Sequence, residues 1–85
     1  MAKVFFPKDF ILVPSNSAKH PPNTQYKVAL GVEDWDGKHV DILKIQMVYD
    51  GKVSGRRSPS YPIDTDDYER VHEAMLSLKK RNRIN

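Results

Sequence analysis

Two nearly identical tetrapeptides, WDGK at residues 35–38 and YDGK at residues 49–52, flank one short apolar segment of the chain. Asp-Gly between apolar segments is typical of a two-residue type I′ turn in a β-hairpin, because both central residues of that turn need positive φ. The repeat therefore predicts two hairpin turns joined by a central strand, residues 39–48. This interpretation assigns the repeated Asp-Gly to turn formation and not to a duplicated site.

The apolar residues around the first turn support one strand register. If residues 36 and 37 form the turn, apolar residues pair across the two strands as Leu30 with Leu43, Val28 with Ile45 and Tyr26 with Met47. All six side chains then lie on one face of the sheet. A slip of one residue would move the apolar side chains of one strand to the other face, so this agreement supports the register.

The second turn extends the hairpin into a three-stranded antiparallel meander. It places Val53 opposite Val48 and Arg57 opposite Lys44, and it directs Tyr49 toward the face of the apolar pairs. Two directly opposed cations repel each other, so an anion between Lys44 and Arg57 would stabilise that arrangement.

The chain before this meander contains two apolar runs and a loop. Residues 4–13 read VFFPKDFILV, and runs this short are typical of strands, either one bent strand or two. Residues 15–24 are polar and include two adjacent prolines, so we expect an exposed loop there. The hairpin meander is assigned to residues 25–62.

One helix is predicted over residues 65–80. Asp64 is expected as its N-cap, and Asp66 and Asp67 suit the positive end of the helix dipole. Ile63 has the spacing of a hydrophobic staple with Tyr68.

The predicted helix also carries an apolar stripe and ends in a basic tail at residues 81–85. The stripe repeats at three- and four-residue steps and consists of Tyr68, Val71, Met75 and Leu78. Such a stripe suits a helix that covers the apolar face of the sheet. The predicted fold class is therefore α+β, an antiparallel sheet followed by one C-terminal helix.

The sheet face that this helix leaves uncovered holds the candidate binding residues. By the same register it carries Lys27, Glu33, Trp35, Lys38, Lys44, Gln46 and Arg57, together with Val40, Ile42, Val48 and Val53. A large aromatic side chain among cations on a partly apolar sheet is typical of single-stranded nucleic-acid binding, in which bases stack on the aromatic ring and cations contact phosphates. Lys52, Arg56 and Arg57 would extend the basic surface along the next strand, and a bulge near Gly55 would change which of the two arginines points outward.

Structural roles for the same residues stay open. A tryptophan beside a turn can fold over the hairpin as a packing residue. Lysines after Asp-Gly turns are ordinarily solvated, and charged residues also protect a sheet edge from aggregation.

Composition excludes several classes of protein. A chain of 85 residues with 39% hydrophobic residues can bury one modest core, so we expect one domain. The net charge of +3 permits a polyanionic partner without requiring one. The lack of cysteine excludes disulfides and thiolate chemistry and is compatible with a reducing cytoplasm. No apolar run approaches the ~18 residues of a membrane helix, so we expect a soluble cytoplasmic protein without membrane contact.

Catalytic and metal sites are not predicted. The three histidines, His20, His39 and His72, fall in the predicted loop, strand and helix without the close spacing of a metal site. No Ser-His-Asp arrangement and no glycine-rich phosphate loop is evident. We therefore expect no enzyme activity, no cofactor and no small-molecule substrate.

Residues 26–78 resemble the positive cofactor four family of transcriptional coactivators and its bacterial and phage-type relatives. The similarity lies in an ordered series of short motifs: a strand, aromatic-x-Gly-Lys, a strand with Asp-Ile, a glycine turn, a Gly-Arg basic segment and an acidic helix start. The resemblance implies a curved four-stranded antiparallel sheet followed by one helix, a homodimer, and sequence-tolerant binding of single-stranded DNA in transcription, replication or recombination.

The resemblance also implies roles for particular residues. Trp35 matches the stacking aromatic and Lys38 the lysine after the glycine, whereas Arg56 and Arg57 match the basic pair. Departures from the family pattern are Gln46 in place of a second aromatic, Leu43 in place of an arginine, and an insertion at residues 15–24. These departures leave RNA as a possible ligand, and they leave a second function class: a small protein-binding regulator or inhibitor of phage or mobile-element type, without nucleic-acid binding.

Overall fold

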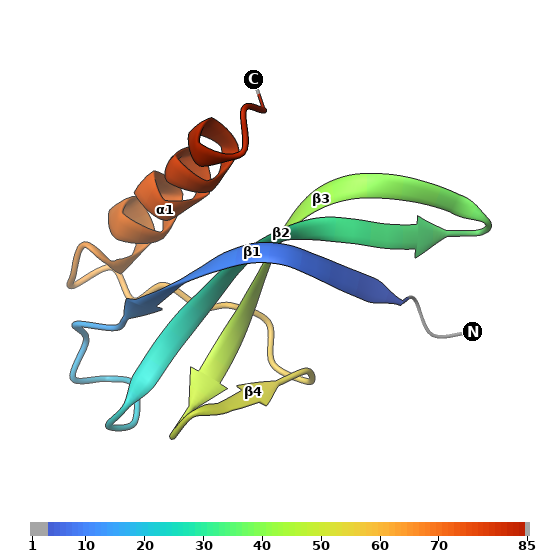
Figure 1. Cartoon of the computed structure of the whole chain (residues 1–85). Helices are drawn as coiled ribbons and strands as arrows, with labels where there is room; N and C mark the ends of the chain where they lie inside the picture. The colour runs from blue at the N-terminus through green and yellow to red at the C-terminus, as the bar shows by residue number, and fades with distance from the viewer. Residues whose placement is uncertain (1–3, 85) are drawn as a thin grey trace.

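The computed structural model describes residues 4–84, which form a four-stranded antiparallel sheet and one C-terminal helix (Figure 1). The strands lie in chain order, and the elements are β1 (Phe5–Pro14), β2 (Thr24–Trp35), β3 (Lys38–Tyr49), β4 (Lys52–Ser54) and α1 (Asp67–Arg81). The predicted α+β class is confirmed.

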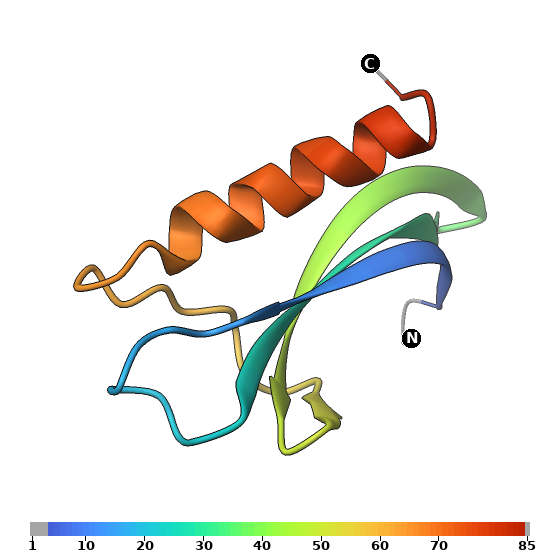
Figure 2. The same cartoon turned by 60° about the vertical axis from the view of Figure 1, so that its left-hand side comes forward.

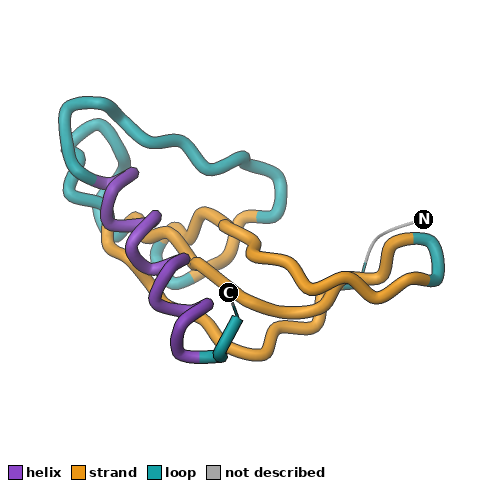
Figure 3. Tube along the Cα trace, turned by 90° about the horizontal axis from the view of Figure 1, so that it is seen from above, coloured by secondary structure: helices purple, strands orange, loops and turns teal. Residues whose placement is uncertain are grey.

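Both Asp-Gly pairs form the predicted turns. The φ angles are 53° at Asp36 and 87° at Gly37, and 51° at Asp50 and 80° at Gly51. Positive φ at both central residues is the conformation of a type I′ turn, whose twist matches that of the strands it joins. The first turn lies at the end of the sheet away from α1 (Figure 3).

The predicted register of β2 and β3 is confirmed, with the three apolar pairs as expected. Their six side chains form or pack against one core cluster, which the helix completes with Val71, Ala74 and Leu78. α1 therefore lies across one face of the sheet and leaves the other without a covering helix (Figure 2). These are called the helix-covered face and the open face below.

The N-terminal segment forms one strand, β1, with an irregular register between Pro7 and Asp9. Gly31 on β2 lies opposite this irregularity, and a Cβ atom there would be 2.3 Å from the carbonyl oxygen of Phe6 and 2.8 Å from the ring of Phe5. Only glycine permits so close an approach of the two strands.

The predicted pairing of Lys44 with Arg57 is wrong. β4 contains three residues and its last pair joins Met47 to Ser54, so the chain has left the sheet before residue 57. The reason is the packing of Tyr61, whose ring stacks on Tyr26 at 5.2 Å on the helix-covered face. Burial of that aromatic ring draws the segment after β4 away from the sheet edge.

The predicted helix start is also wrong. α1 begins at Asp67 with Asp66 as its N-cap residue, and no side chain caps it by a hydrogen bond. Ile63 is fully exposed and forms no staple, and Tyr68 is exposed as well, with its ring against Tyr61 and His72. The acidic side chains fail to cap the helix because they bind the loop between β1 and β2, as described below.

Candidate nucleic-acid interface

Alternation along the strands identifies the side chains of the open face. These side chains alternate with the core residues along each strand and point away from the core. They are Phe10 and Leu12 on β1, Lys27, Glu33 and Trp35 on β2, Lys38, Lys44 and Val48 on β3, and Val53 on β4. The surface combines exposed apolar side chains, aromatic rings and lysines, drawn from all four described strands.

Trp35 lies on the open face and not in the core. Its side chain is 43% exposed, and its indole Nε1 donates a hydrogen bond of 2.7 Å to the carboxylate of Glu33. Glu33 is two residues earlier on the same strand, so the two side chains share a face. The hydrogen bond holds the indole ring in place while part of its surface stays accessible.

Glu33 also binds Lys44. The Lys44 Nζ lies 2.8 Å from Glu33 Oε2 and 5.2 Å from the centre of the Phe5 ring. Glu33 is buried, so the ion pair replaces the water that its carboxylate would otherwise bind. The positive charge of Lys44 is therefore largely balanced within the protein, which the strand pattern did not predict.

Phe10 is a second exposed aromatic residue on the open face, and sequence reasoning missed it. Its side chain is 49% exposed, and the Lys27 Nζ lies 4.9 Å from the centre of its ring, a cation–π contact. The alternation of Phe10 and Leu12 with the core residues Ile11 and Val13 is the signal that could have identified it. Pro7 and the register irregularity hid that alternation.

The structure divides the seven predicted site residues into two groups. Lys27, Trp35, Lys38 and Lys44 share the open face, with Lys38 directly opposite Trp35. Lys52 pairs with Tyr49, which faces the core, and the Arg57 guanidinium lies 5.8 Å from the centre of the Tyr49 ring. The expected extension of the open basic face through Lys52 and Arg57 is therefore wrong, and Arg56 is exposed in the loop after β4.

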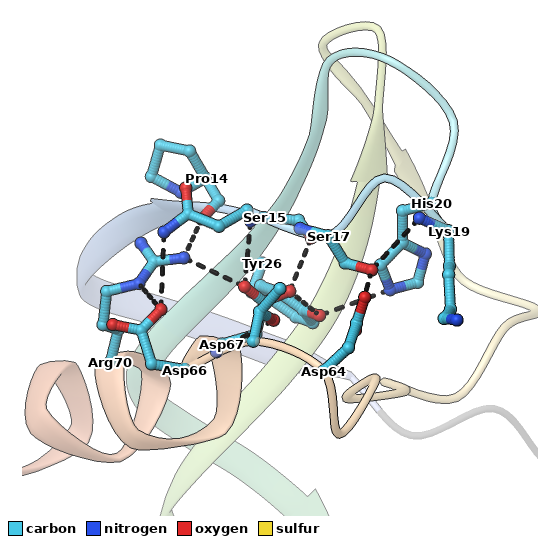
Figure 4. Close-up of polar contacts among 12 residues, drawn as sticks. Pro14, Ser15, Ser17, Lys19, His20, Tyr26, Asp64, Asp66, Asp67 and Arg70 are labelled. Atoms are coloured by element: carbon cyan, nitrogen blue, oxygen red, sulfur yellow. Dashed lines mark hydrogen bonds and ion pairs between the residues drawn. The ribbon is translucent and has the colours of Figure 1, made fainter.

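On the other side of the sheet, a polar network joins the start of α1 to residues 15–23, the loop between β1 and β2 (Figure 4). The fully buried carboxylate of Asp67 accepts hydrogen bonds from the Ser15 hydroxyl, the Asn16 backbone N–H at 2.9 Å and the Tyr26 hydroxyl at 2.8 Å. The Arg70 guanidinium, 3.0 Å away, completes the set.

These contacts shift the pKa values of two buried groups, the Asp67 carboxyl and the Tyr26 hydroxyl. Burial alone would raise the pKa of the Asp67 carboxyl, but the donors from Ser15, Asn16 and Tyr26 outweigh it and hold that pKa well below its ordinary value. Burial and the neighbouring carboxylate raise the pKa of the Tyr26 hydroxyl. Asp67 is therefore a charged anchor for the loop, and the loop is fixed to the helix instead of extending into solvent.

Within residues 4–84, no three His, Asp or Glu side chains are grouped so that they could hold a metal ion. The described helix has 15 residues, and nothing in the described part of the chain is a helix suited to spanning a bilayer.

Comparison of the whole chain with protein-family models, with curated proteins and with solved structures found no match.

Proposed function

We propose that the protein binds single-stranded nucleic acid, DNA in the first instance, on the open face of its sheet. The observation that carries this proposal is the presence of two aromatic side chains on that face, Trp35 and Phe10, each close to half exposed and each next to a lysine. Bases stack on aromatic rings regardless of sequence, and lysines contact the phosphates that connect them.

The geometry supports different roles for the four open-face site residues. Trp35 is held by Glu33 and offers a stacking surface, and Lys38 lies opposite it at the end of the hairpin. Lys27 lies over Phe10 and reaches the same surface from the centre of the sheet. Lys44 orients Glu33, so we assign it a positioning role and not a main phosphate contact.

Titration of the intrinsic fluorescence with oligo-dT tests the proposal, because Trp35 is the only tryptophan. We expect quenching at low salt and recovery as salt is raised, since phosphate contacts weaken with ionic strength. Unchanged emission, together with no detectable binding of a labelled oligo-dT at low salt, would reject this function.

Homodimerisation and membership of the positive cofactor four family are part of the same proposal. The order of four antiparallel strands and a C-terminal helix supports the resemblance noted above. Exposed apolar side chains on α1 and the first strand, Leu76 and Phe6, offer surface for a second copy. Light scattering with and without oligo-dT measures the mass of the protein and of the complex.

A protein-binding module is the second candidate function. The exposed Leu12 and Val53 favour it, because aliphatic side chains at the two edges of the open face add contact area for a protein and do not contact phosphates. No detectable binding of oligo-dT at low salt, by the parent chain and by its open-face variants alike, would favour this alternative.

A further inference from the structure

A second candidate binding site lies on the helix-covered side, away from the open face. It is a pocket of about 600 Å³ between the loop at residues 15–23, the turn after β3 and the segment after β4. Its volume is within the range of small-molecule sites and is larger than inorganic phosphate alone requires. None of the open-face residues lines it.

The pocket is lined by more basic than acidic side chains. Lys19 and Arg57 come from two different segments, and His20 lies beside Lys19. Asp50 is the single acid among the described residues of the lining. The Ser58 hydroxyl adds a neutral donor, whereas the Ser60 hydroxyl donates to the Ser58 carbonyl oxygen at 3.5 Å. Donors supplied by several segments suit a tetrahedral anion, and two cations favour a doubly charged one.

Contacts position the segments that carry the basic residues. The Arg57 guanidinium lies over the Tyr49 ring at 5.8 Å, which leaves its N–H edges for a ligand. The Lys19 backbone N–H donates to Ser17 Oγ at 3.1 Å, and Ser17 Oγ donates to Asp64 at 3.3 Å (Figure 4). His20 Nε2 lies 3.0 Å from the Ser60 carbonyl oxygen, which can only accept, so Nε2 is the donor.

The remaining lining suits a planar ring attached to the anion. Pro21, Pro22 and the Tyr49 ring provide flat apolar surfaces. The Asp50 carboxylate, which accepts from Asn23 Nδ2 at 3.0 Å, retains acceptor capacity for a sugar hydroxyl or an amino group. We propose that this pocket binds a nucleotide through its phosphate monoester, with the phosphate at Lys19 and Arg57 and the base against the proline and tyrosine surfaces.

This second site is separate from the open-face function, so the two are tested by different signals. Titration of ¹⁵N-labelled protein with dTMP, thymidine or inorganic phosphate reports on the pocket through the amide resonances of residues 19, 20, 49 and 57. We expect saturable shifts with dTMP, weaker ones with inorganic phosphate and none with thymidine. Shifts of equal size with thymidine and dTMP would overturn the proposal, because the phosphate would then contribute nothing.

Substitutions locate the site. Lys19→Ala combined with Arg57→Ala should raise the Kd for dTMP at least tenfold, whereas the control Lys80→Ala, an exposed residue of α1, should leave it within twofold. Both changed residues of the double variant are exposed, and a native ¹⁵N spectrum checks that it folds. An unchanged Kd in the double variant would overturn the assignment.

The same double variant separates this proposal from the open-face function. It should leave quenching of Trp35 by 5′-hydroxyl oligo-dT unchanged, and Lys27→Ala should weaken that quenching without changing dTMP binding. A 5′-phosphorylated oligo-dT that shifts the pocket resonances where the 5′-hydroxyl form does not identifies a strand end as the source of the phosphate monoester. Shifts with dTMP but with neither oligonucleotide identify a free nucleotide. If neither dTMP nor 5′-phosphorylated oligo-dT shifts the pocket resonances, the proposed site is rejected, and the result for the open face is unaffected.

Discussion

The Tyr26 hydroxyl donates a hydrogen bond of 2.8 Å to the Asp67 carboxylate, and both side chains are fully buried. The contact joins β2, an inner strand of the sheet, to the first residue of α1. Because the same carboxylate accepts from Ser15 and Asn16, one charged group holds three segments of the chain together.

Replacement of Asp67 should therefore cost more stability than its place at a helix terminus suggests. We expect Asp67→Ala to lower the free energy of unfolding by about 3 kcal/mol, since it leaves several buried donors and the Arg70 charge without their acceptor. Urea denaturation measures the change. Glu73→Ala, an exposed carboxylate on the same helix, is the control, and an equal effect of the two substitutions would contradict this role.

The free energy of unfolding should decrease as the pH is lowered below about 4. The pKa of Asp67 is depressed in the folded protein, so its contribution is complete above the unfolded value of 3.8 and is lost as pH falls toward the lower folded value. The Arg81 side chain lowers the pKa of Asp9 to about 2, and this partly exposed group adds a smaller loss in the same range. Urea midpoints between pH 7 and pH 2.5 should decline less for Asp67→Asn than for the parent chain. Parallel declines would refute the assignment to Asp67.

Removal of the indole ring should weaken binding without unfolding the protein. For Trp35→Ala we expect a loss of about 1–3 kcal/mol in oligo-dT affinity, the usual contribution of one stacked base, and a nearly unchanged melting temperature because the side chain is partly exposed. Anisotropy of a labelled oligo-dT measures the affinity. Tyr68→Ala, an exposed aromatic on α1, should leave it unchanged.

Neutralisation of Glu33 should strengthen binding. Glu33→Gln keeps an acceptor for the indole but releases the charge of Lys44 to contact a phosphate. The slope of log Kd against log salt should then steepen by about 0.7, the value for one added contact on a single strand. Asp41→Asn, a change of the same charge on an exposed side chain of β3, is the control. Equal slopes in both variants would show that total charge, and not the release of Lys44, controls binding.

Gly31→Ala should destabilise the pairing of β1 with β2. The added Cβ would meet the Phe6 carbonyl oxygen at 2.3 Å, so β1 must move, at a cost of about 1–3 kcal/mol. Gly55→Ala adds the same group where no atom lies within 4 Å and should leave stability nearly unchanged. Thermal melts of the two variants give the comparison, and equal melting temperatures would contradict the close approach.

The register of β2 and β3 was predictable because two local rules agree, the conformation that Asp-Gly imposes and the two-residue period of the apolar side chains. That register also predicted which face of the sheet carries Trp35 and Lys44. The ion pair of Lys44 with Glu33 was not predicted, because Lys44 lies opposite Ala29, four residues from Glu33, and neither local rule predicts a contact over that offset.

The other errors have a common cause in contacts between distant parts of the chain. Asp64 and Asp67 resemble helix caps locally, but their partners are Ser17 and Ser15 in the first loop. Arg57 continues the strand pattern locally, but the burial of Tyr61 redirects its segment. A pattern of neighbouring residues contains no information on which distant polar group will be a partner.

The contact between Ser15 and Asp67 spans 52 residues, and it has a consequence for the order of folding. Non-local contacts form late because the chain entropy of closing a long loop must be overcome first. During synthesis the loop at residues 15–23 emerges well before the helix that supplies its acceptors. The sheet can therefore assemble with that loop still mobile, and the loop becomes ordered only when α1 docks.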